Sequence, residues 1–142
     1  MDSTPNAPRS EAMQTNPAAP AAAPRYSLGI DLGTTHCALS WLDTQASDGE
    51  NAVQGVLTVP QLTGPGTVES PELLPSFLYL PHESELAAGD LALPWSATQD
   101  FAVGEFARTR GAATPIRLVS SAKSWLCHPG VDRRSALLPA EA

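Results

Sequence analysis

Residues 28–43, LGIDLGTTHCALSWLD, decide the fold of this chain. Apolar and polar residues alternate over 25–31 and alternate again over 36–42. An alternation with a period of two is typical of a half-buried β-strand. The connection at 32–35 is short and contains a glycine, so the two strands are predicted to form a β-hairpin.

The connection of this hairpin contains the residue types that bind the phosphates of a nucleotide. Gly33 has no Cβ, so a phosphate can approach the main chain closely, and successive amides in a tight turn form a concave anion site. Thr34 and Thr35 add hydroxyl donors at the same turn. Asp31, expected at the end of a buried strand and directed at the turn, can hold Mg²⁺ through its waters. These four residues predict a site for the phosphates and magnesium ion of ATP or ADP.

An ordinary hairpin is the alternative interpretation of the short motif. A strand that ends in Asp and turns through Gly-Thr-Thr is also expected where an aspartate caps a turn. The longer string favours the phosphate site, because an apolar strand precedes the turn and a second alternating strand follows it. The GxxxxGK[ST] and GxGxxG motifs are absent from the sequence, so the site is predicted to differ from both of those loops.

The first part of the chain has a composition that does not favour folding. Residues 1–24 are mostly Ala, Pro, Ser, Thr and Asn, with almost no large apolar side chain. Such a segment buries too little surface to offset its backbone entropy, so a disordered tail is predicted. It also lacks the basic start and apolar run of a secretory signal. Residues 25–142 are predicted to be the folded part.

The folded part is expected to begin with strands and to end with a helix. Besides the hairpin, strands are predicted near 53–59, over 73–80 and over 86–95, with a loop at 61–71. Apolar residues of 118–126 fall at helical spacing, with Pro115 upstream and a Pro-Gly pair at 129–130 as a stop. This order predicts a mixed α/β fold whose sheet begins as a meander.

Charge and cysteine content restrict the partners and the compartment. The net charge of −7 argues against a surface that binds nucleic acid, and no apolar run is long enough to span a bilayer. Neither nucleic acid nor a membrane is therefore an expected partner. Cys37 and Cys127 are predicted to be free thiols in the cytoplasm, and with His36 and His128 they lack the spacing of a zinc site. Lys123 is expected to be a solvated charge.

The stretch 28–43 resembles the beginning of the actin-like ATPase superfamily, which contains the heat-shock-seventy chaperones and the sugar kinases. Three later segments resemble segments of the chaperones, in the same order and at similar spacing. They are LPSF at 74–77, FAVGEFAR at 101–108 and LVSSAKSWL at 118–126. Over about residues 26–130 the chain is therefore similar to a divergent, bacterial-type heat-shock-seventy chaperone. The resemblance implies an incomplete first lobe of an actin-like ATPase domain, which has a ribonuclease H-like fold.

The resemblance also implies roles for individual residues. The first phosphate loop of the family falls on Gly33, Thr34, Thr35 and His36. Asp31 falls beside the magnesium ion, and Arg108 falls at the position of a lysine that contacts the γ-phosphate and the attacking water. His36 differs from the residues common at its position in the family. It is expected either to donate to a phosphate or to be an ordinary strand residue.

Arg108 is the departure that bears most on catalysis. An arginine keeps the positive charge but cannot place a compact ammonium group in the same spot, and phosphoryl transfer depends on such placement. We therefore expect nucleotide binding to be retained and hydrolysis to be slowed, with Arg108→Lys speeding the turnover of ATP in a full-length protein. The alternative is that Arg108 is a solvated residue on a helix face.

Three functions fit the sequence. The first is an ATP-dependent chaperone, whose hydrolysis of ATP is coupled to the binding of client polypeptides and assisted by co-chaperones. The second is an actin-like kinase of a sugar or acid, and the third is a non-catalytic interaction module derived from such an ATPase. The second phosphate loop, the adenosine-binding stretch and the peptide-binding domain of the family are not found before Ala142. We therefore expect a fragment that binds ATP weakly, hydrolyses none by itself and exposes apolar faces.

Overall fold

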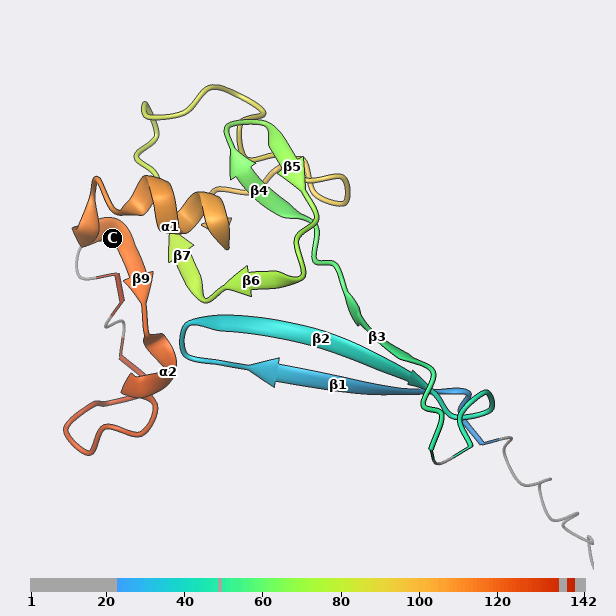
Figure 1. Cartoon of the computed structure of the whole chain (residues 1–142). Coiled ribbons are helices and arrows are strands. Elements are labelled where there is room, and N and C mark those ends of the chain that lie inside the picture. Colours follow the sequence, from blue (N-terminus) through green and yellow to red (C-terminus); the bar gives the residue numbers. More distant parts are fainter. Residues whose placement is uncertain (1–22, 49, 136–137, 140–142) are drawn as a thin grey trace, which may run out of the picture.

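The computed structural model describes residues 23–48, 50–135 and 138–139. The described chain is an α/β protein of small antiparallel sheets with few, short helices (Figure 1). The predicted tail lies outside the described residues, apart from its last two positions. The α/β class is thus confirmed, and the sheet does begin as a meander of β1, β2 and β3.

The first sheet is built on the hairpin that the sequence predicts. Its strands are β1 (Tyr26–Leu32), β2 (His36–Asp43), β3 (Gln54–Leu57) and β6 (Leu73–Pro75). β2 is the central strand, because β1 pairs along one edge while β3 and β6 pair with the two halves of the other edge. The register of the hairpin places Asp31 opposite Ala38 and Leu32 opposite Cys37, which leaves residues 33–35 as its bend.

A second hairpin lies where a loop was expected, so the prediction for 61–71 is wrong. Its strands are β4 (Gln61–Gly64) and β5 (Thr67–Glu69), joined through Gly66, which has a positive φ of 61°. The Gly, Pro and Thr content of this segment suits the turn, but Leu62 is buried and Val68 packs against the core. Tertiary packing has overridden a composition that by itself favours a loop.

The apolar segment 73–80 is divided between two sheets. It breaks at Ser76 into β6 and β7 (Phe77–Tyr79), and β7 is the centre of a third sheet. Its neighbours there are β8 (Ala102–Val103) and β9 (Leu118–Ser120). The prediction of strand structure for this segment is confirmed, whereas its continuity is not.

The helices differ from those expected. They are α1 (Glu105–Gly111), a 3₁₀ turn (Pro115–Arg117) and α2 (Ala122–Trp125). The helix predicted over 118–126 is therefore wrong over its first half, where β9 completes the third sheet, and correct only over α2. The strand predicted over 86–95 is also wrong, because this segment forms turns with one isolated bridge between Leu93 and Ser96.

The buried core is small and lies beneath α1. It consists of Leu62, Tyr79, Ala102, Phe106 and Ala107. These side chains come from β4, β7, β8 and α1, so the core joins the second hairpin to the third sheet. The hairpin of β1 and β2 lies outside this core (Figure 1).

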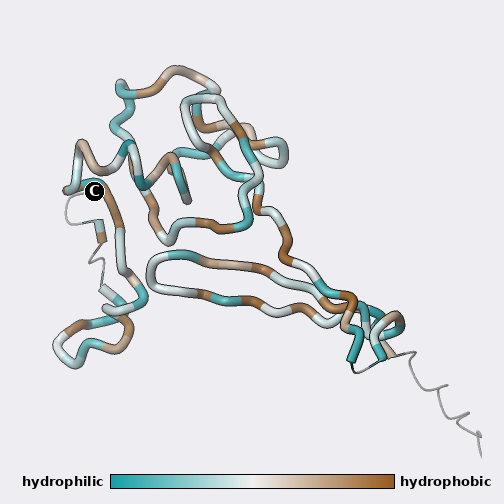
Figure 2. Tube along the Cα trace, in the orientation of Figure 1, coloured by the Kyte–Doolittle hydropathy of each residue, from teal (hydrophilic) through white to brown (hydrophobic). Residues whose placement is uncertain are grey.

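Strand β1 is exposed along its whole length, although it was expected to be buried. Leu28, Ile30 and Leu32 are 61%, 67% and 64% exposed, and the alternation of apolar and polar residues along the hairpin can be followed in Figure 2. The expectation of open apolar faces is confirmed by these values. In the described part of the chain, no helix is both long and apolar enough to cross a membrane.

At the end of the hairpin opposite the bend, a buried carboxylate links the two strands. Asp43 is 4% exposed and accepts two hydrogen bonds from Arg25, at 2.9 and 3.1 Å, and two from the amides of Gln45 and Ala46. The hydrogen bond from Arg25 is the main reason why the pKa of the Asp43 carboxyl lies below its ordinary value of 3.8. The carboxylate thus fixes the start of β1 to the end of β2.

Asp43→Asn is expected to lower stability at neutral pH and to have a smaller effect in acid. A carboxyl with a lowered pKa in the folded state stabilises the fold above its unfolded pKa, and this contribution is lost as the pH falls through the lowered value. The difference in unfolding free energy between the two proteins should be constant between about pH 5 and pH 8 and should shrink below about pH 4. Urea unfolding across this range tests it, with Asp100→Asn at an exposed position as the control. A difference that grows in acid would contradict it.

Candidate phosphate-binding loop

The bend of the first hairpin is a tight turn that only glycine fits. Gly33 is half-buried, and a Cβ at this position would overlap the main-chain carbonyl oxygen of His36. Thr34 and Thr35 are exposed, so their hydroxyl groups are accessible to a ligand. The bend therefore combines a close backbone approach with two exposed hydroxyl donors.

Ser76 donates hydrogen bonds to two main-chain carbonyl groups of the bend. Its hydroxyl donates to the carbonyl oxygen of Gly33 at 2.8 Å, and its amide donates to the carbonyl oxygen of Thr35 at 2.9 Å. The Sγ of Cys37 lies 3.4 Å from the same hydroxyl oxygen. Ser76 occupies the break between β6 and β7, so this break places a serine against the bend.

These contacts fix the direction of a loop amide. In a planar trans peptide the N–H group points opposite to the carbonyl group of the preceding residue. Because Ser76 holds the carbonyl oxygen of Gly33, the N–H group of Thr34 points away from Ser76. The bend thus presents one oriented amide beside two exposed threonine hydroxyls, whereas an anion-binding nest needs successive amides.

Asp31 lies on β1, two residues before Gly33, and is exposed. It lines an open hollow of about 280 Å³ together with Gly29, Ala38, Ser40 and Val56. Among the residues that the structure describes, no group of three or more His, Cys, Asp or Glu side chains could hold a metal ion. The lining of the hollow at Asp31 includes none of the residues 33–36 of the predicted loop.

His36, the first residue of β2, faces a second hollow. This hollow has a volume of about 290 Å³, and Thr63, Glu69 and Glu105 are among the residues that line it. His36 is exposed, and in the part of the chain described here it has no side-chain hydrogen bond to another residue of the loop. The structure thus places His36 beside the predicted loop, in the lining of a hollow that two carboxylates also line.

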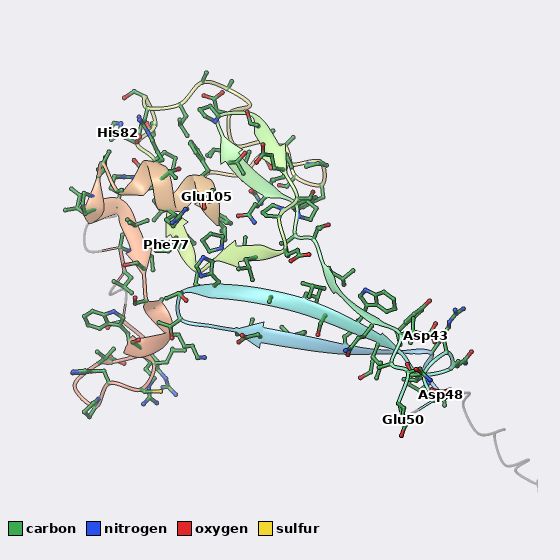
Figure 3. All side chains as sticks on the ribbon, viewed as in Figure 1. Asp43, Asp48, Glu50, Phe77, His82 and Glu105 are labelled. Atoms are coloured by element: carbon green, nitrogen blue, oxygen red, sulfur yellow. The ribbon has the colours of Figure 1, made fainter. Side chains whose placement is uncertain are left out.

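Arg108 lies on α1 and is paired with Glu105. Its guanidinium donates to both oxygens of that carboxylate, at 2.8 and 3.1 Å, and the hydrogen bonding raises the pKa of Arg108 above its ordinary value. The arginine side chain is 51% exposed. Glu105, which Figure 3 shows at the beginning of α1, is the member of this pair that lines the hollow beside His36. The structure therefore joins Arg108 to the rim of that hollow through Glu105.

Two residues at the bend were not assigned to the site from the sequence. Ser76 was part of the segment LPSF, but its hydroxyl was given no role. Lys123 was expected to be a solvated charge, yet its Nζ donates to the carbonyl oxygen of Leu32 at 2.8 Å while the side chain remains exposed. No local sequence pattern signals either contact, because the bonded partners are 43 and 91 residues apart in the chain.

Comparisons of the chain with protein-family models, with curated proteins and with solved structures give no match. The interpretation of the site therefore rests on the residues and on the geometry described above.

Proposed function

We propose that this chain contributes the first phosphate-binding loop of an ATP-binding protein of the heat-shock-seventy type. The observation that carries the proposal is the bend at 33–35, where Ser76 holds the carbonyl oxygens and leaves hydroxyl groups and the Thr34 amide directed outward. A loop of this kind binds the phosphate groups of ATP or ADP, because it offers several fixed donors to an anion without a side chain in the way.

Each loop residue has a role in this proposal. Gly33 allows a phosphate oxygen to reach the main chain, and Thr34 and Thr35 donate hydrogen bonds to it. His36 adds a donor at the next position. Asp31 holds the waters of a magnesium ion that is bound to the same phosphates.

We propose that hydrolysis in the intact protein is slow. Arg108 takes the place of the lysine expected near the γ-phosphate, and Glu105 already occupies its guanidinium. Stabilisation of a transferring phosphoryl group needs a positive charge placed in advance, so an arginine that must first leave a carboxylate serves less well. In the intact protein this ATPase would control the binding of client polypeptides in the cytoplasm, with the help of co-chaperones.

The pair of Arg108 and Glu105 also favours a second candidate. If the pair never opens, the chain is a non-catalytic interaction module that keeps the nucleotide site and lacks hydrolysis. The ATPase rates of the intact protein and of its Arg108→Lys variant separate the two functions, because a non-catalytic module shows no turnover in either.

Calorimetric titration with Mg·ATP tests the proposed function. We expect weak binding, in the millimolar range, because one phosphate loop contacts only part of the nucleotide. Thr34→Ala should weaken it about fivefold through the loss of one hydrogen bond. Thr67→Ala, at an exposed threonine of β5, should leave it unchanged. Absence of binding, or an equal loss in both variants, would contradict the proposal, and micromolar binding would contradict the expectation that the chain is only part of the site.

A further inference from the structure

Lys123 reaches the phosphate loop from a distant part of the sequence. It lies on α2, and its Nζ donates at 2.8 Å to the carbonyl oxygen of Leu32, 91 residues away in the chain. Figure 1 shows α2 beside the bend of the first hairpin. Leu32 directly precedes Gly33, so the ammonium group is bound to the peptide group between them, which is the first of the loop.

This contact fixes the amide of Gly33. The peptide between Leu32 and Gly33 is planar, so its N–H group points away from the ammonium group that holds its carbonyl oxygen. Ser76 holds the next peptide in the same way and fixes the amide of Thr34. Two consecutive loop peptides are thus held through their carbonyl oxygens, one by Lys123 and the next by Ser76.

The charge of Lys123 adds to the effect of its position. A positive donor on a carbonyl oxygen polarises the peptide and makes its N–H group a stronger donor to an anion. In the described residues the ion pairs are Arg25–Asp43, Arg108–Glu105 and Arg110–Glu85. None of them involves Lys123, so among the described residues no salt bridge neutralises its charge.

We infer that Lys123 is a positioning residue of the phosphate loop, which orients and polarises the Gly33 amide for a phosphate oxygen. This inference rests on the proposed function. It also places a positive charge at a loop peptide through Lys123, whereas Arg108 is paired with Glu105.

The test compares Lys123→Met, Lys123→Arg and Arg134→Met in the whole chain. Methionine keeps the length of the side chain without the donor, arginine keeps the donor, and Arg134 is an exposed residue whose substitution removes one charge elsewhere. In the free protein, the amide NMR signal of Gly33 should shift in Lys123→Met, while the signals of core residues such as Phe106 stay in place. The dissociation constant for Mg·ATP should rise about tenfold in Lys123→Met, and it should stay within about threefold in the other two variants.

The two measurements separate failure of the inference from failure of the proposed function. If the unchanged chain binds Mg·ATP and Lys123→Met binds it equally well, the role of Lys123 is overturned and the function stands. If Lys123→Arg is as weak as Lys123→Met, the donor is not what matters, and the inference is also overturned. If the unchanged chain binds no Mg·ATP, the function and the role both fall, although a shifted Gly33 amide would still establish the contact.

Discussion

Leu62→Ala is expected to lower the free energy of unfolding by about 3 kcal/mol. Leu62 is 2% exposed and belongs to the small core beneath α1. Removal of a buried leucine side chain costs the transfer free energy of its methyl and methylene groups and leaves a cavity, for a total of about 2–5 kcal/mol. Domains of this size are stable by about 5–15 kcal/mol, so this loss is a large part of the total.

The matched control for this substitution is Leu28→Ala. Leu28 is 61% exposed on β1, and substitutions at exposed positions change stability by less than about 0.5 kcal/mol. Urea unfolding, followed by the fluorescence of the tryptophans, measures both variants. Equal effects of the two substitutions would show that the hairpin of β1 and β2 is packed as tightly as the core, which would contradict the described fold.

Gly33→Ala is expected to remove measurable binding of Mg·ATP. The added methyl group would overlap the carbonyl oxygen of His36, so the turn has to open. Opening moves the carbonyl groups of Leu32 and Gly33 away from Lys123 and Ser76, and the orientation of the loop amides is lost with them. A loss of at least about tenfold in affinity follows, which corresponds to about 1.4 kcal/mol.

Gly64→Ala is the matched control for the loop glycine. A Cβ at Gly64 would meet only Thr67 at 3.7 Å, an ordinary contact, so the second hairpin accommodates the methyl group. Calorimetry with Mg·ATP should therefore give the affinity of the unchanged chain for this variant. Unchanged binding by Gly33→Ala would contradict the role of the bend as the phosphate site.

The parts of the fold that sequence alone predicts are those set by local pattern. The alternation of apolar and polar residues over 25–31 and 36–42 predicts both strands of the first hairpin, and the bend is what lies between them. The prediction works because neighbouring residues of a strand face opposite sides of the sheet. The errors lie where long-range pairing decides. Residues 118–120 have helical spacing, yet they complete the sheet around β7, and the turn-rich segment 61–71 forms a hairpin because Leu62 fills the core.

The residues of the candidate site fall into the same two groups, those set by local pattern and those set by long-range contacts. Gly33 and the threonines could be predicted, because a phosphate loop needs these residue types in direct succession. The ion pair of Glu105 with Arg108 was overlooked, although their spacing of three residues on a helix favours such a pair. The contacts of Ser76 and Lys123 with the bend could not be derived from spacing, since 43 and 91 residues separate the bonded partners.

Amide NMR during a titration with Mg·ATP, and separately with adenosine, tests the central claim most directly. If the bend binds phosphate, Mg·ATP should shift the amide signals of Gly33, Thr34, Thr35 and His36 more than any others, and adenosine should leave them in place. Shifts centred elsewhere in the chain, or the same loop shifts with adenosine alone, would contradict the claim.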